Sequence, residues 1–132
     1  MNIERINRNI PLAIKLLKKY LVQGQKLDKE LTADVSAFGT SIRQSGLLPT
    51  ICFFLDKKGS SDSTGSDSAK AKERRNKLLD ILSKLIMNRE AENGDSLLTY
   101  AINHPNLEGL EGLLLDAVVS VKLAIRVFEK KN

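Results

Sequence analysis

The stretch SIRQSGLLPTICFFLDKK, residues Ser41–Lys58, decides the fold. Gly46 stands where a left-handed residue commonly ends a helix, and Pro49 suits the first turn of a following helix. The stretch therefore predicts a helix, a sharp corner and a second helix that runs to about Lys58. The structural corner is expected to consist of Phe38, Gly46, Leu47, Pro49, Ile51 and Phe53.

Helical periodicity covers most of the remaining chain. Apolar residues recur at three- and four-residue steps from Ile6 to Leu21, and Pro11 either lies in the first turn of this helix or kinks it. Thr32 is a suitable N-cap for the helix before the corner. Further helices are expected over about 69–92, from Asp95 or Ser96 to Ile102, and over about 107–130. Since no convincing strand pattern appears, we predict an all-α bundle of five to six helices.

A polar segment, GSSDSTGSDS at residues 59–68, separates the corner from the later helices. It contains no apolar side chain, so nothing offsets the entropy cost of ordering it. We therefore expect a mobile loop at about 59–69. Because the flanking halves are too short for separate cores, residues 1–132 are predicted to form a single domain.

The sequence offers little for catalysis or metal binding. It has a single cysteine, Cys52, which excludes an intrachain disulfide, fits a reducing compartment and is expected to be a buried, inert thiol. It also has a single histidine, His104, whereas the usual metal sites need several His or Cys ligands. Acidic pairs such as Asp28/Glu30 are interpreted as solvated helix charge. We therefore predict no enzyme activity, no metal and no cofactor.

The apolar patterning indicates a cytoplasmic protein with no membrane partner. The N-terminal residues carry scattered charges and no apolar core of a signal peptide. The longest uncharged apolar run, residues 46–55, is about half of what a membrane-spanning helix needs.

Positive charge is concentrated in two segments, and the net charge is +5. Residues 1–31 hold seven Lys/Arg against three Asp/Glu, and residues 70–92 hold seven against four. Such segments favour a polyanion as partner, although a solvated basic face is the alternative. The helix after the corner is too apolar to read DNA bases as in a helix-turn-helix, so any nucleic-acid contact would be with the backbone.

The region around the corner resembles one known family. The matching residues are PheGly at 38–39, Ile42, Arg43, SerGlyLeu at 45–47, Thr50, Ile51, Phe53 and Leu55. They are similar to the signature of the small α-helical subunit of the type III-B CRISPR RNA-targeting (Cmr) effector complex. The order of the helices also matches, but the last helix departs from the family pattern because Phe128 is its only aromatic residue.

The resemblance implies a non-catalytic subunit that serves antiviral defence. It would stack with other Cmr subunits, and with copies of itself, and would line the channel that holds guide and target RNA. The residues that would face this RNA are Lys15, Lys18, Lys19, Arg43, Lys57 and Lys58. Arg74 and Arg75 are secondary candidates because they adjoin the polar loop. The alternative function is a helical protein-interaction adaptor with no nucleic-acid role.

Overall fold

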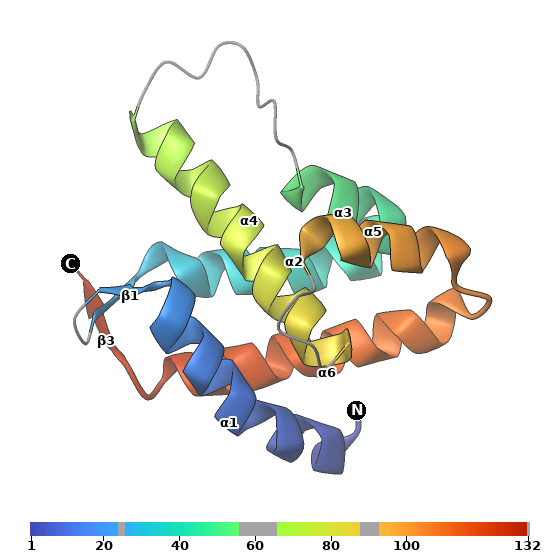
Figure 1. Ribbon diagram of the computed structural model, residues 1–132, viewed down its shortest axis with the longest axis horizontal. Coiled ribbons are helices and arrows are strands. Elements are labelled where there is room, and N and C mark those ends of the chain that lie inside the picture. The colour runs from blue at the N-terminus through green and yellow to red at the C-terminus, as the bar shows by residue number, and fades with distance from the viewer. Residues whose placement is uncertain (24–25, 56–65, 88–92, 132) are drawn as a thin grey trace.

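The computed structural model describes residues 1–23, 26–55, 66–87 and 93–131. Six helices follow one another in this part of the chain: α1 Ile3–Tyr20, α2 Glu30–Ser45, α3 Leu47–Phe54, α4 Ser66–Met87, α5 Gly94–Asn103 and α6 Leu107–Ile125 (Figure 1). Three strands of two or three residues accompany them: β1 Val22–Gln23, β2 Lys26–Asp28 and β3 Glu129–Lys131. The predicted all-α bundle is confirmed.

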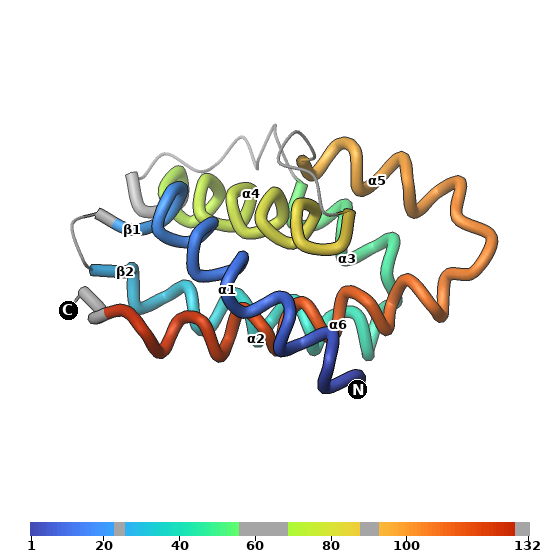
Figure 2. The backbone as a smooth tube through the Cα atoms, turned by 60° about the horizontal axis from the view of Figure 1, so that its bottom comes forward, coloured from blue at the N-terminus to red at the C-terminus, as the bar shows by residue number. Residues whose placement is uncertain are grey.

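The helices enclose one apolar core. Helix α6 lies at its centre and packs against α1, α2 and α4, and Figure 2 shows α4 above the level of α2 and α6. Helices α3 and α5 pack against each other and against α4. The largest side chains that are almost completely buried include Phe38, Leu16, Leu17, Leu31, Ile51, Leu78, Leu82 and Leu110. This aliphatic core agrees with a composition that is 42% apolar but only 5% aromatic.

The predicted corner is present, and Gly46 is its turning point. The Gly46 backbone has φ 94° and ψ 171°, a combination that is essentially restricted to glycine. Its N–H donates to the carbonyl oxygen of Ile42 at 3.0 Å, which closes α2. The Thr50 hydroxyl donates to the Gly46 carbonyl oxygen at 2.8 Å, which ties α3 back to the corner. Below the bend the rings of Phe38 and Phe54 meet edge to face, with their centroids 4.9 Å apart.

The structure corrects two predictions within α3. Phe53 is 62% exposed, so its ring does not belong to the core, and Cys52 is exposed rather than buried. Because α3 is only eight residues long and packs along one face, positions 52 and 53 fall on its outer side. The core aromatic residue is its neighbour Phe54, which is 2% exposed. Helix α3 ends at Phe54, and residues 56–58 lie outside the described part.

Helix starts are set by side chains that the sequence patterns did not single out. Asn93 caps α5 by accepting from the Ser96 N–H at 3.0 Å, and Asn2 and Asn106 cap α1 and α6 in the same way. Helix α2 begins at Glu30, whose N–H donates to the Asp28 carboxylate at 2.9 Å. The predicted N-cap Thr32 was wrong, because it lies inside the helix.

Three further boundaries differ from expectation. The last helix ends at Ile125 instead of about 130, and β3 then pairs in parallel with β2, which also pairs antiparallel with β1. Helix α1 begins at Ile3, so Pro11 lies inside it and not in its first turn. Of the polar loop predicted at 59–69, residues 59–65 lie outside the described part, whereas 66–69 belong to α4.

Candidate nucleic-acid interface

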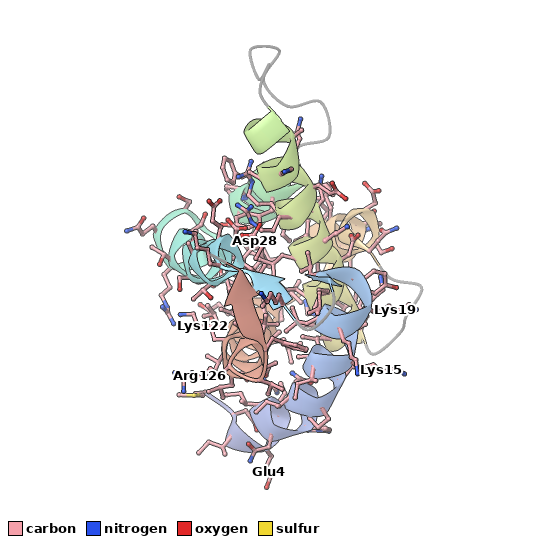
Figure 3. The ribbon with its side chains drawn as sticks, turned by 90° about the vertical axis from the view of Figure 1, so that its left-hand side faces the viewer. Glu4, Lys15, Lys19, Asp28, Lys122 and Arg126 are labelled. Carbon is pink, nitrogen blue, oxygen red and sulfur yellow. The ribbon has the colours of Figure 1, made fainter. Side chains whose placement is uncertain are left out.

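The second half of α1 carries a cluster of exposed lysines. Lys15, Lys18 and Lys19 are all exposed, whereas Leu16 and Leu17 between them are buried in the core. Spacings of three and four residues place these lysines on one side of the helix. Figure 3 shows Lys15 and Lys19 extending from α1 on the opposite side of the molecule from Lys122 and Arg126 of α6.

Arg8 extends this cluster toward the N-terminus. It is exposed and stands seven residues, or about two helical turns, before Lys15. Arg8 was not among the predicted RNA contacts, although its spacing from Lys15 was a usable signal. We call Arg8, Lys15, Lys18 and Lys19 the α1 basic face, which spans roughly 16 Å along the helix.

Arg43 does not join the α1 basic face. It lines a cavity near the start of α1 together with Arg5 and Asp116. The Arg5 guanidinium binds the buried Asp116 carboxylate at 2.6 Å and links α1 to α6. Arg5 lies one helical turn before Arg8 and ten residues, about 15 Å along α1, before Lys15, so Arg43 lies beyond the N-terminal end of the α1 basic face and away from the three predicted lysines. Lys57 and Lys58 lie outside the described residues.

Arg74 is an internal counterion. Its side chain is 9% exposed and binds Asp34, Glu30 at 3.2 Å and Asp28 at 3.4 Å. Burial alone would lower the pKa of Arg74, but its hydrogen bond to Asp34 and the three negative charges outweigh burial and raise it. Asp28 and Glu30 are 49% and 62% exposed, as expected of solvated charge, but they also pair with Arg74, which links α4 to α2 and β2.

Arg75, the next residue, has a different environment. Its guanidinium carbon lies 5.6 Å from the centroid of the exposed Phe53 ring. Among the residues that the structure describes, Arg75 has no hydrogen-bond or ion-pair partner. Arg74 and Arg75 are thus adjacent cations of which only Arg74 is paired with described carboxylates, whereas Arg75 is half-buried against the Phe53 ring.

Few features of the described residues point to chemistry. No group of three His, Cys, Asp or Glu side chains that could hold a metal occurs among them. The His104 Nδ1 accepts a hydrogen bond from the Asn106 N–H at 3.0 Å, and the His104 ring lies beside Tyr100, 5.0 Å away. No helix in the described ranges is both long enough and apolar enough to span a membrane.

Fold and surface together define a small helical binding protein with exposed cationic residues. A family model described as CRISPR-associated protein (Cas_Cmr5) matches residues 8–110. The chain belongs to this family, the small subunit of the type III-B Cmr CRISPR complex, and the resemblance seen around the corner is confirmed. It is therefore a Cmr complex subunit in CRISPR defence that associates with other Cmr subunits. No curated protein and no solved structure matches the chain.

Proposed function

We propose that this subunit holds the guide and target RNA of the Cmr complex through the α1 basic face, as a cytoplasmic and non-catalytic component. The observation that carries the proposal is a segment of the sequence that contains basic residues but no Asp or Glu. Residues 5–27 contain six Lys/Arg and no Asp or Glu, and four of these cations form the α1 basic face. A phosphate chain that follows α1 would therefore meet no negative side chain of α1 beyond Glu4.

Binding by this face would depend on charge and not on base sequence. Lysine binds phosphate as a point charge, and each contact releases counterions from the nucleic acid. Base pairing between guide and target supplies the sequence recognition, so the subunit needs only to hold the backbone. The expected affinity is accordingly weak for the isolated chain, steeply salt-dependent and similar for different sequences.

The test is the affinity of the purified chain for a labelled, unstructured RNA, measured by fluorescence anisotropy at about 50 mM and about 200 mM salt. The variant Lys18→Glu/Lys19→Glu is expected to weaken binding and to lower the salt slope by about 0.7 for each phosphate that is no longer neutralised. The matched control, Lys122→Glu/Arg126→Glu, makes the same charge change on the opposite side of the molecule (Figure 3).

Equal reductions in affinity for the two variants would show that only net charge matters and would refute the α1 basic face. The variant Arg43→Glu is measured beside them, because Arg43 was predicted as an RNA contact but lies at another place on the surface. We expect it to behave like the control. Retained circular dichroism of each variant excludes unfolding as the cause.

The alternative, a protein-interaction adaptor with no RNA role, is favoured by one other observation. The α5–α6 corner exposes Tyr100 at 43%, Ile102 at 62% and Leu107 at 41%. Large apolar side chains left exposed near one corner are candidates for contact with a protein partner. If Ile102→Asp abolishes association with the neighbouring Cmr subunits while no variant of α1 changes RNA affinity, the adaptor becomes the better description. Contact between copies of the chain is a further proposal for the same surface.

A further inference from the structure

Phe53 and Arg75 form a pair at the surface, outside the apolar core. The Phe53 ring, from α3, is 62% exposed, and the Arg75 guanidinium, from α4, lies over it at 5.6 Å. Phe53 also meets the ring of the buried Phe54 edge to face, with centroids 5.7 Å apart. The pair is therefore held on a rigid part of the core while much of the Phe53 ring remains open to solvent.

In the described parts of α3 and α4, the charged side chains that share the side of the Phe53–Arg75 pair are basic. Helix α3 contains no Asp, Glu, Lys or Arg. On α4, Lys72 stands three residues before Arg75 and so lies on the same side of the helix. The nearest acid along α4, Glu73, is bound to Lys77 at 3.0 Å. Phe53, Arg75 and Lys72 thus bring an aromatic ring, a planar guanidinium and a lysine to one side of the described parts of α3 and α4, where the acid nearest to Arg75 along α4 is already paired with a lysine.

This combination matches the chemistry of a nucleotide. A base stacks on an aromatic face, Arg adds a cation–π contribution, and a lysine neutralises phosphate. We propose that Phe53 and Arg75 form a stacking platform for one unpaired base of single-stranded RNA, with Lys72 beside its phosphate. The proposal rests on the RNA role argued above, but it uses a different surface from the α1 basic face.

The platform would distinguish single-stranded from paired RNA. Every base has a π-face, so stacking tolerates any sequence. A base inside a duplex already stacks on its neighbours and cannot reach the ring. The α1 basic face, in contrast, would bind the phosphates of either form. A protein partner that covers Phe53 is the competing occupant, and the positive charge around the ring favours RNA over it.

The test compares Phe53→Leu with wild type on a single-stranded and on a duplex RNA of equal length. Removal of one stacked base is expected to weaken single-strand binding roughly 5- to 150-fold, with the salt slope unchanged, and to leave duplex binding unaltered. Phe53→Tyr should retain the affinity, because it keeps the aromatic face. The matched control is Ile102→Ala, which removes an equally exposed apolar side chain on α5.

A cross-linking experiment on the assembled Cmr complex gives an independent readout. A target RNA that carries 5-iodouridine at successive positions is irradiated, and cross-linked peptides are mapped by mass spectrometry. A cross-link at Phe53 that Phe53→Leu removes supports the platform. Cross-links elsewhere on the chain with none at Phe53 overturn it.

The two proposals fail differently. If Phe53→Leu leaves single-strand affinity unchanged while Lys18→Glu/Lys19→Glu still lowers it, the platform is wrong and the α1 basic face stands. If Phe53→Leu instead releases a Cmr subunit in a pull-down without changing RNA affinity, the ring binds protein and the platform is refuted. If Phe53→Leu weakens single-strand binding but Lys18→Glu/Lys19→Glu does not change RNA affinity, the platform stands and the α1 basic face is wrong.

Discussion

Replacing Arg74 by Met should be among the most destabilising substitutions on this surface. Arg74 and Asp34 are 9% and 12% exposed, and breaking such a nearly buried pair typically costs about 3–5 kcal/mol. The ion pairs with Asp28 and Glu30, which are 49% and 62% exposed, add little. At about 2.1 cal/mol/K of unfolding entropy per residue, this destabilisation lowers the Tm by roughly 10–18 °C.

The assay is urea unfolding followed by circular dichroism, with the free energy of unfolding taken from the midpoint at constant slope. The pKa of Arg74 is raised in the folded state, and a raised pKa adds stability that disappears only as pH rises through the folded value. The folded-state pKa of Arg74 lies well above the working pH range. Ionisation of Arg74 should therefore add nothing to the pH dependence, and the difference in the free energy of unfolding between wild type and Arg74→Met should stay constant from about pH 6 to about pH 9.

Arg75→Met is the matched control, because it removes the same side chain from the next position. We expect it to change the free energy of unfolding by no more than about 0.5 kcal/mol, as for an ordinary surface substitution. A double-mutant cycle with Asp34→Asn then isolates the pair, and its coupling should account for most of the destabilisation. A cost below about 1 kcal/mol for Arg74→Met, or equal costs for both arginine variants, would refute the reasoning.

Four other substitutions or reagents probe the fold. Gly46→Ala should lower the free energy of unfolding by about 1–3 kcal/mol, because its φ of 94° strains any other residue. Gly112→Ala in α6 should raise it by about 0.5–1 kcal/mol, since no atom lies within 4 Å of the added Cβ; urea unfolding checks both. Asp116→Asn should lower the Tm, at a cost of about 1–3 kcal/mol, because its buried carboxylate binds Arg5. Cys52 should react with Ellman's reagent in the native protein without denaturant, and slow reaction would contradict its exposure.

The corner could be predicted because its causes are local. Gly46 needs a positive φ, and Pro49 fits the first turn of a helix, whatever the rest of the chain does. Long helices such as α6 were predictable from periodicity, since their stripes repeat over several turns. The strands were not, because two or three residues are too few for an alternating pattern. Strand β2 pairs with β3, far along the chain, as in the register Leu27–Lys130.

The candidate site was less predictable because exposure and pairing depend on distant partners. Arg74 and Arg75 look alike in the sequence, but one residue on a helix turns the side chain by about 100°. That turn directs Arg74 to Asp34, which is 40 residues away, and directs Arg75 to Phe53. The same turn separates Phe53 from Phe54, of which only the second enters the core. The apolar stripe of α4, continued back four residues from Leu78, places position 74 on the buried face, but it does not reveal the partner that each arginine meets.

Some basic residues of this protein neutralise buried carboxylates and others lie on the surface, and this difference changes how its net charge should be interpreted. A net charge of +5 predicts a polyanion partner only in general terms, and Arg5 and Arg74 serve the fold by neutralising buried carboxylates. If binding came from net charge, every lysine or arginine variant would lower RNA affinity by a similar factor. If the α1 basic face and the Phe53–Arg75 platform bind separately, charge variants of α1 should change the salt slope, whereas Phe53→Leu should change affinity for single strands alone. The salt slope of RNA binding therefore distinguishes phosphate contacts of the α1 basic face from base stacking on the Phe53–Arg75 platform.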